Sequence, residues 1–205
     1  AGSAGKRRFG AAGCVLMDYE TAVTQLLDYF NACGRKRVAL FSVSDASPHD
    51  THKTDAFLHY KGGCYTHNDI FYYRGLTLAT CEAFIADYRR YDAVIGTNDV
   101  SSSILMRMLS QHRIRVPEDI FIASFGDTNF AKNATNRITL ATLNLSDVGI
   151  YAVRMCRTLT ENPEISNSTI ALRCSIDVRE STANIPFSIA ETMPETEPVS
   201  PYDYY

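Results

Sequence analysis

Hydrophobic positions along the chain form short continuous runs, and these runs alternate with segments of helical periodicity. Runs of this kind predict strands that are buried on both faces. The predicted strands are residues 13–18, 38–45, 70–75, 92–99 and 120–125. The predicted helices between and after them are residues 19–34, 52–60, 76–88 and 100–112. Such alternation is typical of an α/β fold in which a parallel sheet carries helices on both faces.

The pattern changes after residue 127. A short strand is predicted at residues 138–143, then the most regular helix of the chain at 145–159, then a last strand at 168–180. The apolar face expected on that helix contains Leu145, Val148, Gly149, Ala152, Val153, Cys156 and Leu159. Residues 1–12 are interpreted as a linker or disordered start, and residues 185–205 as an acidic, proline-containing tail.

Polar residues follow three of the predicted strands. Asp45, Asn98, Asp99, Gly126 and Asp127 stand where those strands end. In a parallel sheet with right-handed crossovers, the carboxyl ends of the strands meet at one edge, where ligands bind. Asn and Asp also cap helices, and that is the interpretation favoured for Asp99. Asn98 and Asp127 are expected to face a ligand.

Composition narrows the possible function classes. The chain has 205 residues, 45% of them hydrophobic, and a formal net charge of −3. A mildly acidic chain lacks the basic surface needed for direct contact with nucleic acid. Its apolar runs are too short to cross a membrane. We find no GxSxG, Walker or GxGxxG motif and no paired carboxylates in a recognisable frame, so an enzyme is not expected.

The cysteines and histidines do not predict a metal site or a cofactor. No two of the six cysteines form a CxxC pair, so we expect free thiols rather than disulfides or zinc ligands. Cys14, Cys81, Cys156 and Cys174 lie in apolar segments and are expected to be buried. The histidines at 49, 52 and 59 are more consistent with solvated loop and helix positions than with metal ligands.

Five segments in this order resemble a known family. They read DAVIGTND, IRVPEDIFIASFGDTNFA, ITLATLNLSDVGIYAVRMCRTL and DVRESTAN, with VLMDYETAVTQLLDYFNACGRKRVALFS upstream. Together they resemble the C-terminal part of LacI/GalR-type bacterial transcriptional repressors. The resemblance extends from about residue 13 to residue 184.

The resemblance implies a two-lobed, type I periplasmic-binding-protein-like fold that senses a small effector in its cleft. Residues 13–184 would form a partial effector-binding and dimerisation domain. Its C-terminal lobe would contain residues 19–139 and 169–179, and residues 144–161 would lie in the N-terminal lobe. Operator DNA would be bound only through a helix-turn-helix domain that this chain does not contain. The protein would be cytoplasmic. A periplasmic-type sugar or solute-binding protein is the alternative.

The resemblance also implies a set of effector contacts. Asn98 matches the family's asparagine after the fourth strand, and Lys53 matches its basic residue after the second. Asp127, His49 and Asp18 complete the candidate effector-binding residues. A carboxylate and a glutamine of the family pattern are replaced by Gly126 and Leu143. We therefore expect a sugar-like or anionic effector rather than a simple neutral hexose.

A homodimer is the last implication of the resemblance. In the family, the segments matching residues 100–112 and 128–136 help to form the dimer. Ile104, Leu105, Met108 and Leu109 are expected to face the sheet, with Met106 pointing outward. The predicted interface residues are Met106, Ser103, Ser110 and Asn129.

Overall fold

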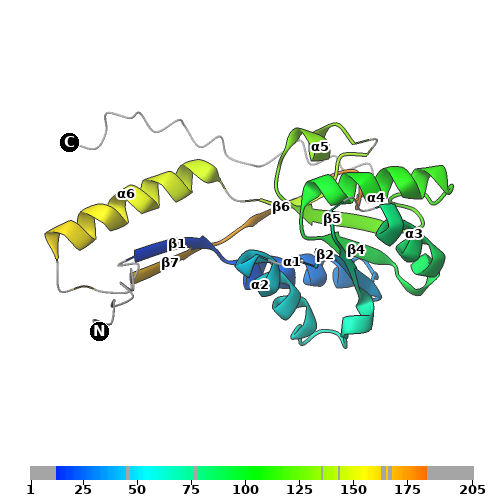
Figure 1. The fold of residues 1–205 in the computed structure, drawn as a ribbon, viewed down its shortest axis with the longest axis horizontal. Helices are drawn as coiled ribbons and strands as arrows, with labels where there is room; N and C mark the ends of the chain where they lie inside the picture. The colour runs from blue at the N-terminus through cyan, green and yellow to red at the C-terminus, as the bar shows by residue number, and fades with distance from the viewer. Residues whose placement is uncertain are drawn as a thin grey trace, which may run out of the picture.

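A computed structural model describes residues 13–44, 47–75, 78–134, 136–142, 144–162, 165 and 168–183. These residues form a larger body on a six-stranded sheet and a narrower arm beside it (Figure 1). Positions 45 and 143 of the sequence analysis lie outside the described residues, as do the interpreted linker, residues 1–12, and the interpreted tail, residues 185–205.

The six-stranded sheet has the order β3-β2-β4-β5-β6-β8. Its strands are β2 (Val38–Val43), β3 (Ile70–Tyr73), β4 (Ala93–Gly96), β5 (Phe121–Phe125), β6 (Thr139–Thr142) and β8 (Ser175–Asp177). The first five strands in that order are parallel, and β8 is antiparallel to β6. The predicted parallel α/β sheet is thus confirmed, apart from one antiparallel edge strand.

Helices cover both faces of this sheet, as the alternating pattern predicted (Figure 1). The helices on one face are α1 (Tyr19–Ala32) and α2 (Pro48–Leu58). Those on the other face are α3 (Leu78–Asp87), α4 (Asp99–Gln111) and the short α5 (Asn129–Lys132). Two 3₁₀ turns, η1 (His67–Asp69) and η2 (Tyr88–Arg90), complete the connections.

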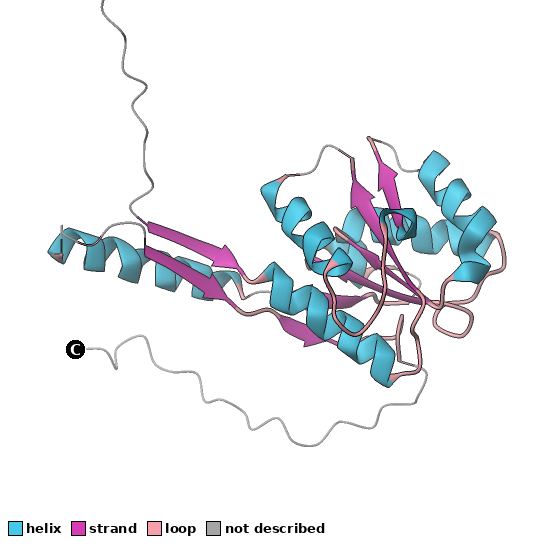
Figure 2. Ribbon diagram, turned by 90° about the horizontal axis from the view of Figure 1, so that it is seen from below, coloured by secondary structure: helices cyan, strands magenta, loops and turns pink. Residues whose placement is uncertain are grey.

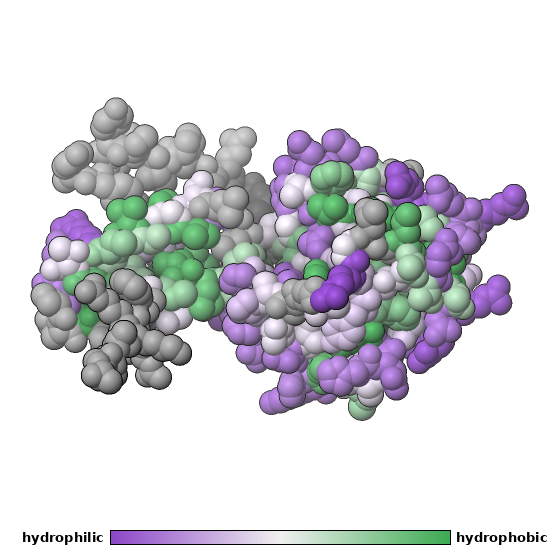
Figure 3. Space-filling model, viewed as in Figure 1, coloured by the Kyte–Doolittle hydropathy of each residue, from purple (hydrophilic) through white to green (hydrophobic). Residues whose placement is uncertain are grey.

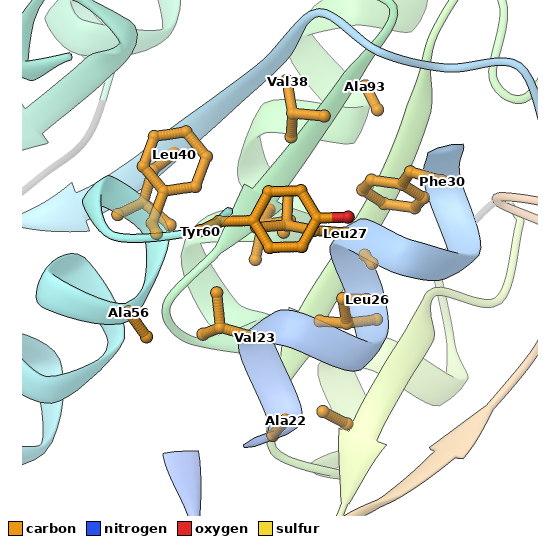
Figure 4. Close-up of a cluster of buried hydrophobic side chains, with 14 of the residues drawn as sticks. Ala22, Val23, Leu26, Leu27, Phe30, Val38, Leu40, Ala56, Tyr60 and Ala93 are labelled. Atoms are coloured by element: carbon orange, nitrogen blue, oxygen red, sulfur yellow. The ribbon is translucent and has the colours of Figure 1, made fainter. Parts of the chain in front are cut away.

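Each face of the sheet has its own hydrophobic core. In β2, Val38 and Leu40 pack toward α1 and α2, whereas Ala39 and Phe41 pack toward α3 and α4. This alternation explains why the strand is a continuous apolar run. Figure 4 shows side chains of α1 in one cluster with Val38, Leu40 and Tyr60. Full burial of one such side chain stabilises the fold by about 1.5–3 kcal/mol.

The arm consists of a two-stranded parallel sheet and one long helix (Figure 2). Its strands are β1 (Gly13–Met17) and β7 (Ser168–Leu172), and the helix α6 (Leu145–Glu161) packs on β1. The prediction of one last strand was wrong, because residues 168–172 pair with β1 and residues 175–177 pair with β6. Both halves are apolar enough to resemble one strand, so the pattern did not reveal the change of sheet.

The arm is less buried than the sequence predicted. Cys81 and Cys174 are buried, but Cys14 on β1 and Cys156 on α6 are exposed. Val153 of α6 is 71% exposed, although it lies on the predicted apolar face. The arm has one helix and two strands, so each of these elements is covered on one side only. Figure 3 shows apolar surface along the arm. The expectation that all four cysteines are buried was therefore wrong for two of them.

Candidate functional site

The carboxyl ends of β2, β4 and β5 lie at one edge of the sheet. These three strands are adjacent and parallel, so the segments that follow them emerge together. The turn after β4 bonds back to β2, since Thr97 N–H donates to the Phe41 carbonyl at 3.0 Å. The prediction that these strands finish at one shared edge is confirmed.

Lys53 is buried close to this edge, with 6% of its surface exposed. The ammonium donates to Asp50 Oδ1 at 3.2 Å and to the Thr97 carbonyl at 2.9 Å. It also lies 4.7 Å from the ring centroid of Tyr19 and 4.9 Å from that of Phe125. Burial lowers the pKa of Lys53, and the nearby carboxylate of Asp50 opposes that shift. Lys53 is thus a desolvated cation between an anion and two aromatic faces.

The first turn of α2 positions this cation. Ser47 and Asp50 form a capping box, which fixes Asp50 one helical turn before Lys53. Burial alone would raise the pKa of Asp50, but the Ser47 hydroxyl and Lys53 outweigh it, and the pKa is lowered. His49 in the same turn is exposed, and its ring centroid lies 5.4 Å from that of Tyr19. Two candidate residues, Lys53 and His49, therefore flank Tyr19.

Asn98 is the N-cap of α4, a role the sequence analysis assigned to Asp99. Its Oδ1 accepts the Ser101 N–H at 2.9 Å, and its Nδ2 donates to the hydroxyl of Tyr73. Tyr73 in turn donates to Ser101 Oγ at 3.0 Å. The amide of Asn98 is therefore held in one orientation by β3 and α4 together.

Asp127 is held by two cations. Lys132 Nζ lies 3.1 Å from its Oδ2, and Arg179 Nη2 lies 3.1 Å from its Oδ1. Burial alone would raise the pKa of Asp127, but these two partners outweigh it, and the pKa is lowered. The carboxylate is thus engaged within the protein, and it links the loop after β5 to the segment after β8.

Asp18 caps α1 and lines a cavity. Its Oδ1 accepts the Thr21 N–H at 3.0 Å. The cavity beside it has a volume of about 380 Å³ and lies between the helices α1 and α2 and the arm. The described residues that line it are Leu16, Met17, Asp18, Tyr19, Glu20, His52, Asp55, Ala56, His59 and Ala171. The lining does not include Lys53, Asn98 or Asp127.

The predicted dimer residues lie along α4 and α5. Ser103, Met106 and Asn129 help to line a groove of about 500 Å³, and Ser110 lines a neighbouring one of about 330 Å³. The expectation that Met106 points to solvent was wrong, since it is 4% exposed. Met106 belongs to the core cluster that also contains Ala131 of α5. The helix α4 is packed against α3, α5 and the sheet. Phe130 on α5 also lines this groove and, at 58% exposed, is a large apolar side chain on its surface.

Several residues at the edge were not found from the sequence. Tyr19, Phe125 and Tyr73 lie in segments predicted as helix or strand, where aromatic side chains are expected as core.

Within the described residues, no cluster of three His, Cys, Asp or Glu side chains could hold a metal ion. None of the described helices is long and apolar enough to cross a membrane.

A family model described as the periplasmic binding protein-like domain matches residues 27–182. The match covers most of the chain, and the chain belongs to this family. A comparison with curated protein sequences gave no significant match.

Solved structures of transcriptional regulators have the same fold, and one of those reported below is of the LacI family. The transcriptional regulator CelR in complex with cellobiose is 18% identical, with a TM-score of 0.72 over 84% of this chain and 54% of CelR. A LacI family regulator from Arthrobacter sp. FB24 in complex with lactose is 20% identical, with a TM-score of 0.70 over 85% and 67%. CcpA of Lactococcus lactis is 20% identical, with a TM-score of 0.69 over 82% and 64%. The chain thus spans between half and two thirds of their length.

Proposed function

We propose that this chain is the effector-sensing and dimerisation module of a LacI-family transcriptional regulator. The observation that carries the proposal is the buried ammonium of Lys53, which lies between the Thr97 carbonyl and the ring of Tyr19. It stands at the sheet edge where this fold binds ligands. The similar proteins include regulators in complex with cellobiose and lactose. They favour a cytoplasmic regulator over a periplasmic-type solute-binding protein.

The two parts of the structure fit two lobes of such a module. The body on the six-stranded sheet would be the C-terminal lobe, and the arm of β1, β7 and α6 would be part of the N-terminal lobe. This assignment moves residues 169–172 out of the C-terminal lobe in which the resemblance had placed them, because β7 pairs with β1. The chain passes between them after β1, after β6 and after β7. The effector would bind where the carboxyl ends of the larger sheet face the arm.

The effector is sugar-like or anionic in this account. Two of the three N–H groups of the Lys53 ammonium are directed at Asp50 and Thr97, which leaves one for a ligand acceptor. A partly desolvated cation binds a carboxylate or phosphate more strongly than a neutral hydroxyl. The rings of Tyr19 and Phe125 supply apolar surface beside it.

A ligand panel on the full-length protein tests this function. Calorimetry or thermal shift would compare neutral sugars, sugar phosphates, uronic acids and nucleosides. We expect an anionic or sugar-like compound to bind with a Kd that Lys53→Met raises about tenfold or more, because a hydrogen bond to a charged group is lost. Micromolar binding of a plain hexose that Lys53→Met leaves unchanged would refute the role of Lys53.

Homodimer formation and DNA binding are further parts of the proposal. The α4–α5 groove, with Phe130 at its surface, supports self-association there. Operator DNA would be bound through a separate helix-turn-helix domain, because the chain described here carries a net charge of −3. We expect no sequence-selective, salt-dependent DNA binding by these 205 residues alone.

A further inference from the structure

Two basic segments, residues 35–37 and 89–90, lie side by side at the amino edge of the six-stranded sheet. They precede β2 and β4, which are adjacent and parallel, so both segments reach this edge. Arg37 Nη1 donates to the carbonyl of Arg89 at 3.3 Å, across 52 positions of the chain. This edge is opposite the carboxyl ends of the strands, where Lys53 lies.

A small cavity of about 180 Å³ lies between these segments and the loop before β3. Among the described residues that line it, the cations are Lys36, Arg37 and Arg90, and the carboxylate is Asp69. The lining is therefore positive, although the whole chain has a formal net charge of −3. Small-molecule sites usually enclose about 300–1,000 Å³, so a cavity of this size fits one small anionic group.

The carboxylates at this cavity already have donors within the protein. Asp69 Oδ2 accepts the Thr66 N–H at 2.8 Å, and its Oδ1 accepts the Tyr91 hydroxyl at 3.4 Å. Asp92, next to the lining residue Tyr91, accepts the Arg37 Nε–H at 3.1 Å and a second bond from the same guanidinium. Arg37 is thus neutralised by Asp92 and serves to join the two segments, which leaves the other two cations of the lining.

Lys36 and Arg90 keep unused donors. Both residues are exposed, and within the described part of the chain the Lys36 ammonium has no hydrogen-bond acceptor. Arg90 donates through Nη1 to Asp87 at 3.0 Å, and its guanidinium lies 5.4 Å from the ring centroid of Tyr91. No described residue accepts a hydrogen bond from its Nε or Nη2. An ammonium and a guanidinium with free N–H groups therefore line the same cavity.

A phosphate group matches this pair of donors. It carries a charge of about −1.5 to −2 at neutral pH and has at least three acceptor oxygens. A guanidinium binds phosphate through two parallel N–H bonds, and an ammonium binds it as a point charge. A carboxylate has one charge and two oxygens, so it would use the two cations less fully.

We propose that this cavity binds a phosphate group, of a free phosphate ion or of a small phosphate monoester, between Lys36 and Arg90. The cavity is at the amino edge of the sheet, whereas Lys53 is at the carboxyl edge, so the protein would have two separate ligand sites. The inference is independent of the proposed effector contact at Lys53.

The test is an NMR titration of the full-length protein, followed at the backbone amides of Lys36 and Tyr91. The probes are inorganic phosphate and glycerol phosphate, added separately at an ionic strength held constant with chloride. Lys36→Met and Arg90→Met are the test variants, and neither removes core packing because both residues are exposed. The controls are Lys61→Met, at an exposed lysine, and Arg157→Met, since Arg157 also pairs with a carboxylate one helical turn away.

We expect saturable shifts of both amides, with a Kd that each test variant raises about tenfold or more, as for loss of a hydrogen bond to a charged group. The control variants should leave this Kd unchanged, and so should Lys53→Met. Tighter binding of glycerol phosphate would identify a monoester as the ligand, and tighter binding of inorganic phosphate would identify the free ion.

Three results would overturn the inference. The first is a shift that chloride reproduces at equal ionic strength, because it would reflect screening alone. The second is a Kd that neither Lys36→Met nor Arg90→Met changes. The third is a Kd at these amides that rises in Lys53→Met, which would mean that phosphate binds at the carboxyl edge instead. None of these results would test effector sensing itself, which the ligand panel addresses.

Discussion

The ammonium of Lys53 donates to the carbonyl of Thr97 at 2.9 Å, and this bond joins α2 to the end of β4. The two residues are 44 positions apart in the chain. Both lie at the edge where α1, α2 and the central strands meet. A single buried side chain thereby connects the elements that would surround an effector.

Lys53→Met should destabilise the protein by about 1–3 kcal/mol, because a buried carbonyl and the carboxylate of Asp50 lose their shared donor. Methionine keeps most of the apolar stem, so loss of packing contributes little. Urea unfolding monitored by circular dichroism measures the change. Lys61→Met, at an exposed residue, is the control. If both variants unfold at the wild-type urea concentration, the Lys53 contacts do not stabilise the fold.

Asn98→Asp and Asn98→Ala separate two contributions of the Asn98 amide, the N-cap bond that its oxygen accepts and the bond that its nitrogen donates to Tyr73. Alanine removes the N-cap of α4 and should cost about 0.5–2 kcal/mol. Aspartate keeps the cap acceptor but loses the N–H donated to Tyr73, so its cost should be smaller. Chemical denaturation of the three proteins ranks them. Equal destabilisation by both substitutions would show that the cap is not the main contribution.

The pKa of Asp119 tests its ion pair with Arg115, which lies at the end of the sheet opposite the candidate site. The guanidinium of Arg115, 2.8 Å from Asp119 Oδ1, lowers the pKa of this carboxyl from 3.8 to about 2. Since the folded-state pKa is the lower one, the ion pair stabilises the fold above pH 3.8, and this contribution is lost as the pH falls toward about 2. NMR titration of the Asp119 carboxyl should give the low value. In Arg115→Gln the value should rise toward 3.8, and a wild-type pKa already near 3.8 would contradict this account.

Phe130→Asp should weaken self-association. It places a charge on the exposed apolar residue of the α4–α5 groove, and an unpaired charge buried in an interface costs several kcal/mol. Sedimentation of the full-length protein should show the dimer Kd raised about tenfold or more. Leu78→Asp, at another exposed apolar residue, on α3, is the control and should leave the Kd unchanged. A dimer equally stable in both variants would place the interface elsewhere.

The larger sheet could be predicted from the sequence because its strands are buried on both faces. Val38 to Phe41 all contact core, so the apolar run and the strand coincide. The arm could not be predicted in the same way. Its one helix and two strands leave Val153 and Cys14 exposed, and periodicity does not say which element covers an apolar face.

The candidate site was predictable in position but not in its contacts. Strand ends located Asn98 and Asp127 at one edge, because parallel strands finish together, whereas Lys53 was identified only through the family resemblance. The partners of these residues depend on tertiary packing. Tyr73 reaches Asn98 from a different strand, and Asp127 is engaged by Arg179, 52 positions away. No local pattern encodes such pairings.

The central claim is that the full-length protein couples effector binding to DNA binding. The direct measurement is the affinity of the full-length protein for DNA from upstream of its own gene, with and without the ligand that calorimetry identifies. We predict that saturating ligand changes this affinity by about tenfold or more, within the usual range of allosteric coupling. The response should be lost in Lys53→Met and retained in Lys61→Met. An unchanged DNA affinity at saturating ligand, or no sequence-selective DNA binding at all, would contradict the account.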